Sequence, residues 1–219
     1  MIQAVIFDMD GLMIDSERVT YEGYVTECEK LGTSMDKDFY KRLLGLPKPA
    51  IFRSFHDQYG QSFPIEQVMV RVHQYMEDRF RQEGVPVKEG LAELLTYLKA
   101  HDYKTVVATS STRDRVDRIL AQTGLIDYFD GSVCGDEVER GKPDPDIFLK
   151  ACRKADVPPA QALVLEDSET GIEAAHSAGI PVICVPDMKY PAEEFAKKTY
   201  GIAESLSQVL AMLQAGSLL

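Results

Sequence analysis

The sequence predicts an α/β protein, in which a parallel sheet is flanked by helices and an all-helical domain is inserted after the first strand. Three observations support this. An apolar run over residues 2–7 stops abruptly at Asp8, strand-like and helical segments alternate from Val85 onward, and the residues between show helical periodicity without a convincing strand. Repeated strands and helices of this length favour a parallel sheet that is covered on both faces.

The first expected element is a buried strand, Ile2-Gln3-Ala4-Val5-Ile6-Phe7, which is followed directly by Asp8-Met9-Asp10-Gly11. A β-branched run that ends at two carboxylates and a glycine is typical of a strand with charge at its carboxyl end. In open parallel sheets, ligands bind in the crevice beyond these strand ends. The two acids are therefore placed for metal binding or nucleophilic attack, although Asp and Gly are also ordinary turn residues.

Residues 16–84 are expected to form the inserted helical domain. Helical spacing is clearest for five apolar residues: Ile65, Val68, Val72, Met76 and Phe80. Glycine and proline mark helix boundaries near residue 32, at 45–49 and at 60–64. We assign residues 1–15 and 85–219 to the core domain and 16–84 to the cap. The connections near 15–16 and 84–87 would be hinges that let the cap move over the sheet as a lid.

The second part of the chain predicts the remaining strands and helices in alternation. Helices are expected at residues 90–100, 113–124, 145–155 and 171–179, and strands at 104–109, 131–134, 162–165 and 181–185. A final amphipathic helix, expected on one face of the sheet, carries Leu206, Val209, Leu210 and Leu213. The first strand belongs to the same sheet as these later strands.

Composition excludes several classes of protein. The chain has 219 residues, 45% of them hydrophobic, and no apolar stretch approaches the roughly 18 residues of a membrane span. Its formal net charge of −11 argues against nucleic acid or an anionic membrane as partner. A metal ion, one lysine and backbone amides could still hold a small phosphate locally. No obligate protein partner is indicated.

The cysteines and the start of the chain indicate a cytoplasmic protein. The first residues lack the basic, apolar and small-residue pattern of a secretory leader. The four cysteines are widely separated and show neither metal spacing nor a CxxC motif. We expect them to be buried thiols, since free cysteine mostly behaves as a small hydrophobic residue.

Polar residues also follow three of the later segments. Thr109-Ser110-Ser111 follows the strand at 104–109, Lys142 lies in the loop Gly141-Lys142-Pro143-Asp144-Pro145, and Glu166-Asp167 follows the strand at 162–165. Each has an ordinary explanation as a strand-end hydroxyl, a solvated loop charge, or an acidic pair at a helix N-terminus. Together, however, they converge on the sheet edge that carries Asp8.

This combination predicts phosphoryl transfer. An acidic cluster from two strands binds Mg²⁺ through hard oxygen ligands, while Lys142 and Thr109 supply donors for the oxygens of a transferring phosphoryl group. Asp8 is then available to attack phosphorus. The turn at Gly11 can swing Asp10 toward the leaving oxygen, which Asp10 would protonate before it deprotonates water.

The chain resembles the haloacid dehalogenase-like (HAD) hydrolase superfamily and, within it, the β-phosphoglucomutase-like phosphatases with a helical cap. Four motifs occur in order over nearly the whole chain: the DxDG of Asp8 to Gly11, the strand-end Thr109, Lys142 in GKPDPDIF, and the acidic pair in LEDSETGIEAAHSAG. The resemblance implies a Rossmann-like core that carries a helical cap.

The resemblance also implies roles for individual residues. Asp8 would be the nucleophile that forms an aspartyl-phosphate, and Asp10 would be the general acid and base. The phosphoryl group would be held by Thr109 and Lys142, with Ser110 at the same site. Mg²⁺ would be bound by Asp8, the backbone carbonyl of Asp10, and Asp167, with Glu166 assisting.

Members of this superfamily catalyse different reactions. Asp10 argues against a dehalogenase, because cleavage of a carbon–halogen bond needs no acid at that position. Three functions remain to be compared. Lys48 falls near the phosphate-binding arginine of β-phosphoglucomutases, but the histidine on the first cap helix of those mutases aligns with Thr20. Hydrolysis of a small phosphorylated metabolite, such as a sugar or polyol phosphate, is therefore favoured. A β-phosphoglucomutase-type phosphomutase is the alternative, and a non-catalytic phosphometabolite-binding module is the third hypothesis. Specificity is expected from Thr20, Tyr24, Lys48, Phe52, Ser111 and Arg113.

Overall fold

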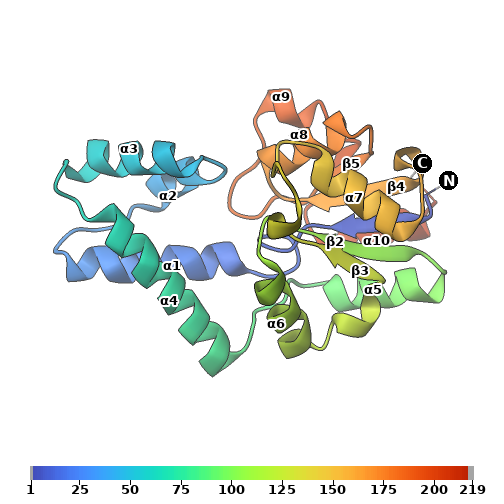
Figure 1. Ribbon diagram of the computed structural model, residues 1–219, viewed down its shortest axis with the longest axis horizontal. Helices are drawn as coiled ribbons and strands as arrows, with labels where there is room; N and C mark the ends of the chain where they lie inside the picture. The colour runs from blue at the N-terminus through green and yellow to red at the C-terminus, as the bar shows by residue number, and fades with distance from the viewer. Residues whose placement is uncertain (1, 217–219) are drawn as a thin grey trace. The chain divides into compact units, whose positions relative to one another are not determined.

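The computed structural model describes residues 2–216 and divides into two compact units (Figure 1). The sheet unit comprises residues 2–15 and 86–216, and the helical unit is Ser16–Val85. Within the described residues, six parallel strands form one sheet in the order β3-β2-β1-β4-β5-β6. These strands are β1 (Ala4–Phe7), β2 (Lys104–Ala108), β3 (Gly131–Val133), β4 (Ala162–Glu166), β5 (Val182–Cys184) and β6 (Gly201–Ile202). The predicted α/β fold is confirmed.

Strand β1 lies at the centre of the sheet, and its register brings three strand ends to one level. Phe7 is opposite Val107 of β2 on one side and Leu165 of β4 on the other. One residue further along the chain, Asp8 is therefore level with the last residues of β2 and β4. All six strands run in the same direction, so their carboxyl ends share one edge of the sheet.

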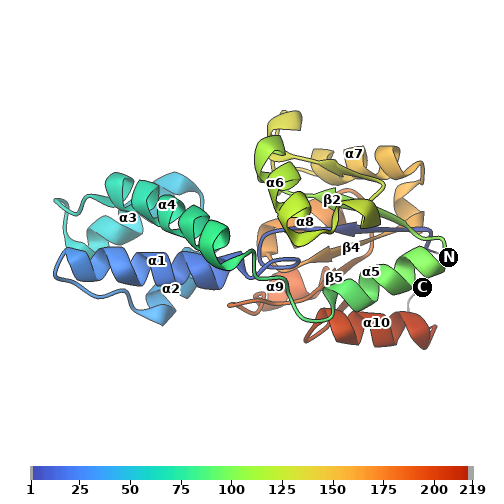
Figure 2. The same ribbon diagram turned by 90° about the horizontal axis from the view of Figure 1, so that it is seen from below.

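Two layers of helices cover the sheet, and Figure 2 shows α5 and α10 on the side opposite α7. The helices of this unit are α5 (Leu91–Ala100), α6 (Arg113–Thr123), α7 (Asp146–Ala155), α8 (Glu169–Ser177), α9 (Glu193–Ala196) and α10 (Leu206–Gln214). Apolar residues of α7 and α8 pack with alternate residues of β1, β2, β4 and β5 in one fully buried cluster. On the other face, α5 buries four leucines at helical spacing: Leu91, Leu94, Leu95 and Leu98.

The helical unit consists of α1 (Ser16–Lys30), α2 (Lys37–Leu43), α3 (Lys48–Tyr59) and α4 (Ile65–Glu83). The five apolar residues that predicted α4 are all buried. Helices α1 and α4 approach closely at Gly23, where a Cβ would lie 3.1 Å from the side chains of Val72 and Tyr75. The interior also contains aromatic rings, among them Tyr24, which packs 5.5 Å from Phe55. Only 6% of Tyr24 is exposed, which places it in the interior of this unit.

One strand and one α-helix of the sheet unit have no counterpart in the sequence prediction. Strand β6 is two residues long and α9 four; neither length allows a periodic pattern to develop. Helix α8 begins at Glu169, two residues earlier than expected, because the Ser168 hydroxyl accepts a hydrogen bond from the Gly171 N–H as an N-cap.

Two predictions from composition can be compared with the fold. All four cysteines are free and buried, as expected. Between residues 2 and 216, no helix combines the length and the apolar character needed to span a lipid bilayer.

Candidate active site

Lys142 joins the ends of three strands through its ammonium group. Its Nζ donates to Asp8 Oδ1 at 2.5 Å, to Glu166 Oε1 at 2.7 Å and to the carbonyl of Ala108 at 3.1 Å. Asp8 follows β1, Ala108 ends β2 and Glu166 ends β4, so each of the three ammonium donors serves a different strand. Only 5% of the Lys142 side chain is exposed. The predicted convergence of Asp8, Lys142 and Glu166 is present.

These side chains carry one more negative than positive charge, since two buried carboxylates face a single ammonium. Burial raises the pKa of Asp8 to about 8; the charge of Lys142 opposes this and that of Glu166 adds to it. Burial alone would lower the pKa of Lys142, but the charges of Asp8 and Glu166 raise it above its usual value. Lys142 therefore remains an ammonium, and Asp8 is a carboxyl group that holds its proton more tightly than usual.

The raised pKa of Asp8 predicts a pH dependence of stability. The folded value of about 8 lies above the ordinary 3.8, so the native state binds this proton more tightly than the unfolded chain. The resulting stabilisation is fully present below pH 3.8 and is lost as the pH rises toward about 8. In urea unfolding without metal, the wild type should therefore lose stability relative to Asp8→Asn between pH 5 and pH 8. Parallel curves for the two proteins would contradict the raised pKa.

Three carboxylates at this edge could hold a metal ion. Asp8, Glu166 and Asp167 each place one oxygen so that all three lie within 4.8 Å of one another. Hard carboxylate oxygens are the donors that Mg²⁺ prefers. A Cβ at Gly11 would lie 2.2 Å from Asp167 Oδ2, so glycine leaves room for that carboxylate. The donor set thus fits a divalent cation.

Glu166 is the most constrained of these acids. Its Oε1 accepts from Lys142, and its Oε2 accepts from the N–H and the hydroxyl of Ser168 at 2.7 and 2.9 Å. A Cβ at Gly171 would lie 1.8 Å from Glu166 Oε1. Glycine at the first turn of α8 is therefore required for this carboxylate to occupy its position.

The loop after β2 places the hydroxyl residues that were expected to bind phosphate. Thr109 is 1% exposed; its N–H donates to Val133, and its Oγ1 accepts from the N–H of Ser111 at 3.2 Å. The turn after β3 supports this loop, because the Gly135 N–H donates to the carbonyl of Ser111 at 2.8 Å. A Cβ at Gly135 would lie 2.2 Å from the carbonyl oxygen of Ser110. Ser110, which is exposed, is thus fixed through its backbone.

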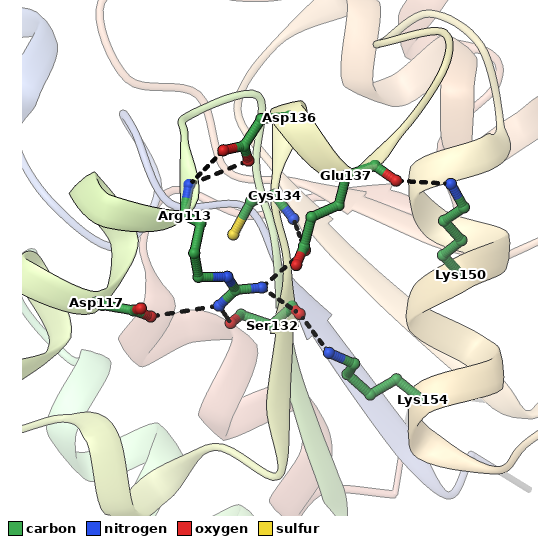
Figure 3. A network of polar contacts seen from close by, with 8 residues as sticks. All are labelled: Arg113, Asp117, Ser132, Cys134, Asp136, Glu137, Lys150 and Lys154. Atoms are coloured by element: carbon green, nitrogen blue, oxygen red, sulfur yellow. Dashed lines mark hydrogen bonds and ion pairs between the residues drawn. The ribbon is translucent and has the colours of Figure 1, made fainter.

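Arg113 serves the edge of the sheet, which corrects its expected place among the specificity residues. Figure 3 shows its guanidinium directed at β3, where it donates to the Ser132 hydroxyl at 2.5 Å and carbonyl at 3.0 Å. It also donates to Glu137 at 2.7 Å, and Lys154 donates to the same Ser132 carbonyl at 2.8 Å. Charged side chains of this kind satisfy the exposed carbonyls of an edge strand.

Both carboxylate oxygens of Asp10 are held by residues that follow β2. Its Oδ1 accepts from an Arg115 NH2 donor at 2.7 Å, and its Oδ2 accepts from the Ser111 hydroxyl at 2.7 Å. The side chain of Asp10 is not among the clustered metal-ligand candidates, so a metal role would fall to its backbone carbonyl. Sequence reasoning missed Arg115, which lies in the first turn of α6, four residues after Ser111.

The three remaining specificity candidates, Thr20, Lys48 and Phe52, lie in the helical unit. Thr20 on α1 donates its hydroxyl to the sulfur of Met76 at 3.7 Å. Lys48 begins α3, is exposed, and places its Nζ 5.4 Å from the ring centroid of Phe52. Both contacts are internal to this unit.

Comparison with known proteins gives consistent matches over most of the chain. Residues 5–185 match the family model described as haloacid dehalogenase-like hydrolase. A phosphorylated carbohydrates phosphatase of Thermotoga maritima is 32% identical over 216 residues, which cover 99% of this chain and 92% of the relative. A probable pseudouridine-5'-phosphatase of Drosophila melanogaster is 33% identical over 204 residues, covering 90% and 87%. The crystal structure of a putative β-phosphoglucomutase from Thermotoga maritima has 30% identity and a TM-score of 0.80, covering 98% of this chain and 99% of that one.

Proposed function

The chain belongs to the haloacid dehalogenase-like hydrolase family, as a phosphatase of its β-phosphoglucomutase-like group, and on this premise we propose that it is Mg²⁺-dependent and releases phosphate from a sugar or polyol phosphate. The relative named a phosphorylated carbohydrates phosphatase supports this substrate class. The helical unit is the cap, from which Thr20 and Lys48 would contribute to specificity. Four free, buried thiols fit work in the reducing cytoplasm.

One observation carries the proposal: a buried carboxylate at the end of the central strand is paired with a buried lysine beside further acids. Asp8 Oδ1 lies 2.5 Å from Lys142 Nζ, and the oxygens of Asp8, Glu166 and Asp167 cluster within 4.8 Å. A carboxylate nucleophile needs cations nearby to approach a phosphoryl group that is itself negative. In this arrangement Lys142 is one cation, and the clustered carboxylate oxygens are ligands for a second, a divalent metal ion.

In the first step, an Asp8 carboxylate oxygen attacks phosphorus while the bond from phosphorus to the ester oxygen breaks. The protonated Asp10 gives its proton to the departing oxygen, so that the alcohol leaves neutral. Thr109 would donate a hydrogen bond to a transferring oxygen, and Lys142 would bind the phosphoryl group with the donor that Asp8 releases as its oxygen bonds to phosphorus. The product of this step is an aspartyl-phosphate on Asp8 and an ionised Asp10.

In the second step, Asp10 takes a proton from a water molecule, which attacks the phosphorus of the aspartyl-phosphate. The bond from phosphorus to Asp8 breaks, inorganic phosphate leaves, and both carboxyl groups return to their starting states. Asp8, the backbone carbonyl of Asp10, and Asp167 would hold Mg²⁺. When bound, this ion keeps Asp8 ionised and neutralises charge on the phosphoryl oxygens.

Water rather than a sugar hydroxyl is proposed as the acceptor. Thr20 offers a hydroxyl engaged with the Met76 sulfur, where the β-phosphoglucomutases that this chain resembles carry a histidine. A threonine hydroxyl neither ionises nor takes up a proton near neutral pH, so it is not an effective general base for a sugar acceptor. A phosphomutase would instead convert a hexose phosphate without releasing inorganic phosphate, after priming by a hexose bisphosphate.

Removal of divalent metal is expected to stop phosphate release, and added Mg²⁺ is expected to restore it. The measurement is free phosphate from a panel of hexose, pentose and polyol monophosphates, first after EDTA treatment and then with excess MgCl₂. We expect activity to fall at least about 10²-fold, because the ion stabilises charge directly at the reacting group.

Parallel chromatography of the sugar phosphates separates the two candidate reactions. Hydrolysis predicts free sugar and phosphate in equal amounts. Isomerised sugar phosphate that depends on added bisphosphate would replace the hydrolase assignment by a mutase. Full activity in the chelated protein would contradict metal dependence.

A further inference from the structure

Three side chains form a closed triangle beside the proposed nucleophile. Arg115 donates from NH2 to Asp10 Oδ1 at 2.7 Å and from Nε to the Ser111 hydroxyl at 3.2 Å, and that hydroxyl donates to Asp10 Oδ2 at 2.7 Å. All three residues belong to the sheet unit. The Arg115 side chain is 11% exposed and that of Asp10 is 28% exposed, so the guanidinium is the more shielded partner of this ion pair. Both oxygens of Asp10 are consequently fixed in space.

The position of Arg115 in α6 indicates that its role is the ion pair with Asp10 and not stabilisation of the helix. Arg115 is the third residue of α6, within the first turn. A positive charge in the first turn opposes the helix dipole, which favours acids there. The helix itself therefore gains nothing from an arginine at this position, whereas Asp10 gains a charge-assisted hydrogen bond.

The two oxygens of Asp10 are chemically distinguished by their partners. A guanidinium has five donors and no acceptor, so the oxygen that faces Arg115 can only accept. A serine hydroxyl can donate or accept, because its hydrogen rotates. Oδ2 is thus the oxygen that can carry a proton while the triangle stays intact, with the Ser111 hydroxyl turning to accommodate it.

From this geometry we propose that Arg115 is a positioning residue, which orients Asp10 through Oδ1 so that Oδ2 delivers the proton to the leaving group and collects it from water. The inference rests on the proposed phosphatase function and adds a residue to it. Arg115 itself touches neither the phosphoryl group nor the nucleophile in this role. Its effect should therefore appear only where proton delivery limits the rate.

A pair of matched substrates isolates proton delivery. Phenyl phosphate and 4-nitrophenyl phosphate have similar shapes, but phenolate leaves poorly without a proton, whereas nitrophenolate leaves readily. The value of kcat/KM reports on departure of the leaving group in the first chemical step. For Arg115→Met, we expect kcat/KM to fall about 10- to 100-fold with phenyl phosphate and less than about threefold with 4-nitrophenyl phosphate.

Two further variants complete the test. Arg115→Lys keeps one donor for Asp10 and should recover part of the loss with phenyl phosphate. Arg153→Met, which removes a 64% exposed arginine on α7, should leave both substrates unaffected. An equal loss with both substrates for Arg115→Met, or no loss with either, overturns the positioning role while leaving the phosphatase intact. If the wild type hydrolyses neither substrate, nor any sugar phosphate of the panel, the proposed function itself fails.

Discussion

Asp8→Asn is expected to reduce phosphate release by at least about 10³-fold, because an amide cannot act as the nucleophile and no other carboxylate replaces it. The fold should be retained. The amide that replaces the carboxylate can still accept a hydrogen bond from Lys142 through its carbonyl oxygen, and the change removes the excess buried negative charge of the site. Free phosphate measured with the best substrate of the panel gives the rate, and thermal unfolding gives the integrity of the fold.

Trapping of the covalent intermediate distinguishes loss of the nucleophile from indirect damage. Acid quenching with a ³²P-labelled substrate should leave label on the wild type and none on Asp8→Asn. Asp117→Asn is the matched control, since its side chain is 61% exposed on α6 and lies outside the acidic cluster. Near-normal turnover by Asp8→Asn would remove the aspartyl-phosphate mechanism altogether.

The order of strands and helices could be predicted because the patterns are local. The buried run before Asp8 and the leucines of α5 follow the periods of a strand and a helix. The placement of β1 beside β2 and β4 follows from pairing across long stretches of sequence, which a periodic pattern does not specify. That placement was inferred only in general terms, from the expectation that all buried parallel strands share one sheet.

The candidate site was predictable to the extent that it depends on strand ends. Asp8, Thr109 and Glu166 lie at one edge because parallel strands in register finish there, and the sequence marks each strand end with a polar residue. Lys142 lies on a loop, and a loop has no periodic pattern of apolar residues from which its path could be predicted. Its place between Asp8 and Glu166 is a tertiary contact that only the structure specifies.

Side-chain direction accounts for what the sequence did not predict. Arg113 and Arg115 are two residues apart on α6, yet Arg113 turns to β3 and Arg115 turns to Asp10. Residues at i and i+2 project from different sides of a helix, but which side faces the site depends on how the helix packs. Tyr24, also a specificity candidate, lies in the interior of the helical unit, the position that its apolar neighbours in the sequence favour.

Lys142→Met is expected to damage both stability and activity. It leaves the buried carboxylates of Asp8 and Glu166 facing each other without a counter-ion, and breaking a buried ion pair costs about 3–5 kcal/mol. Loss of the cation beside the phosphoryl group should also lower kcat about 10²- to 10³-fold. Urea unfolding in EDTA at pH 8 measures the first effect, and phosphate release with Mg²⁺ measures the second.

A second substitution separates charge repulsion from loss of packing. If like charges cause the instability, adding Asp8→Asn to Lys142→Met should restore more stability than Asp8→Asn adds to the wild type, with a coupling of about 0.5–3 kcal/mol. The single variant should also be less impaired at pH 5 than at pH 8, because a carboxyl group that takes up a proton no longer repels its neighbour. Lys197→Met, at a side chain that is 72% exposed, is the control and should change neither quantity. A loss of stability that does not depend on pH, with no coupling between the two substitutions, would contradict charge balance. Lys142 would then stabilise this edge of the sheet by packing against Phe148, whose ring centroid lies 4.9 Å from its Nζ.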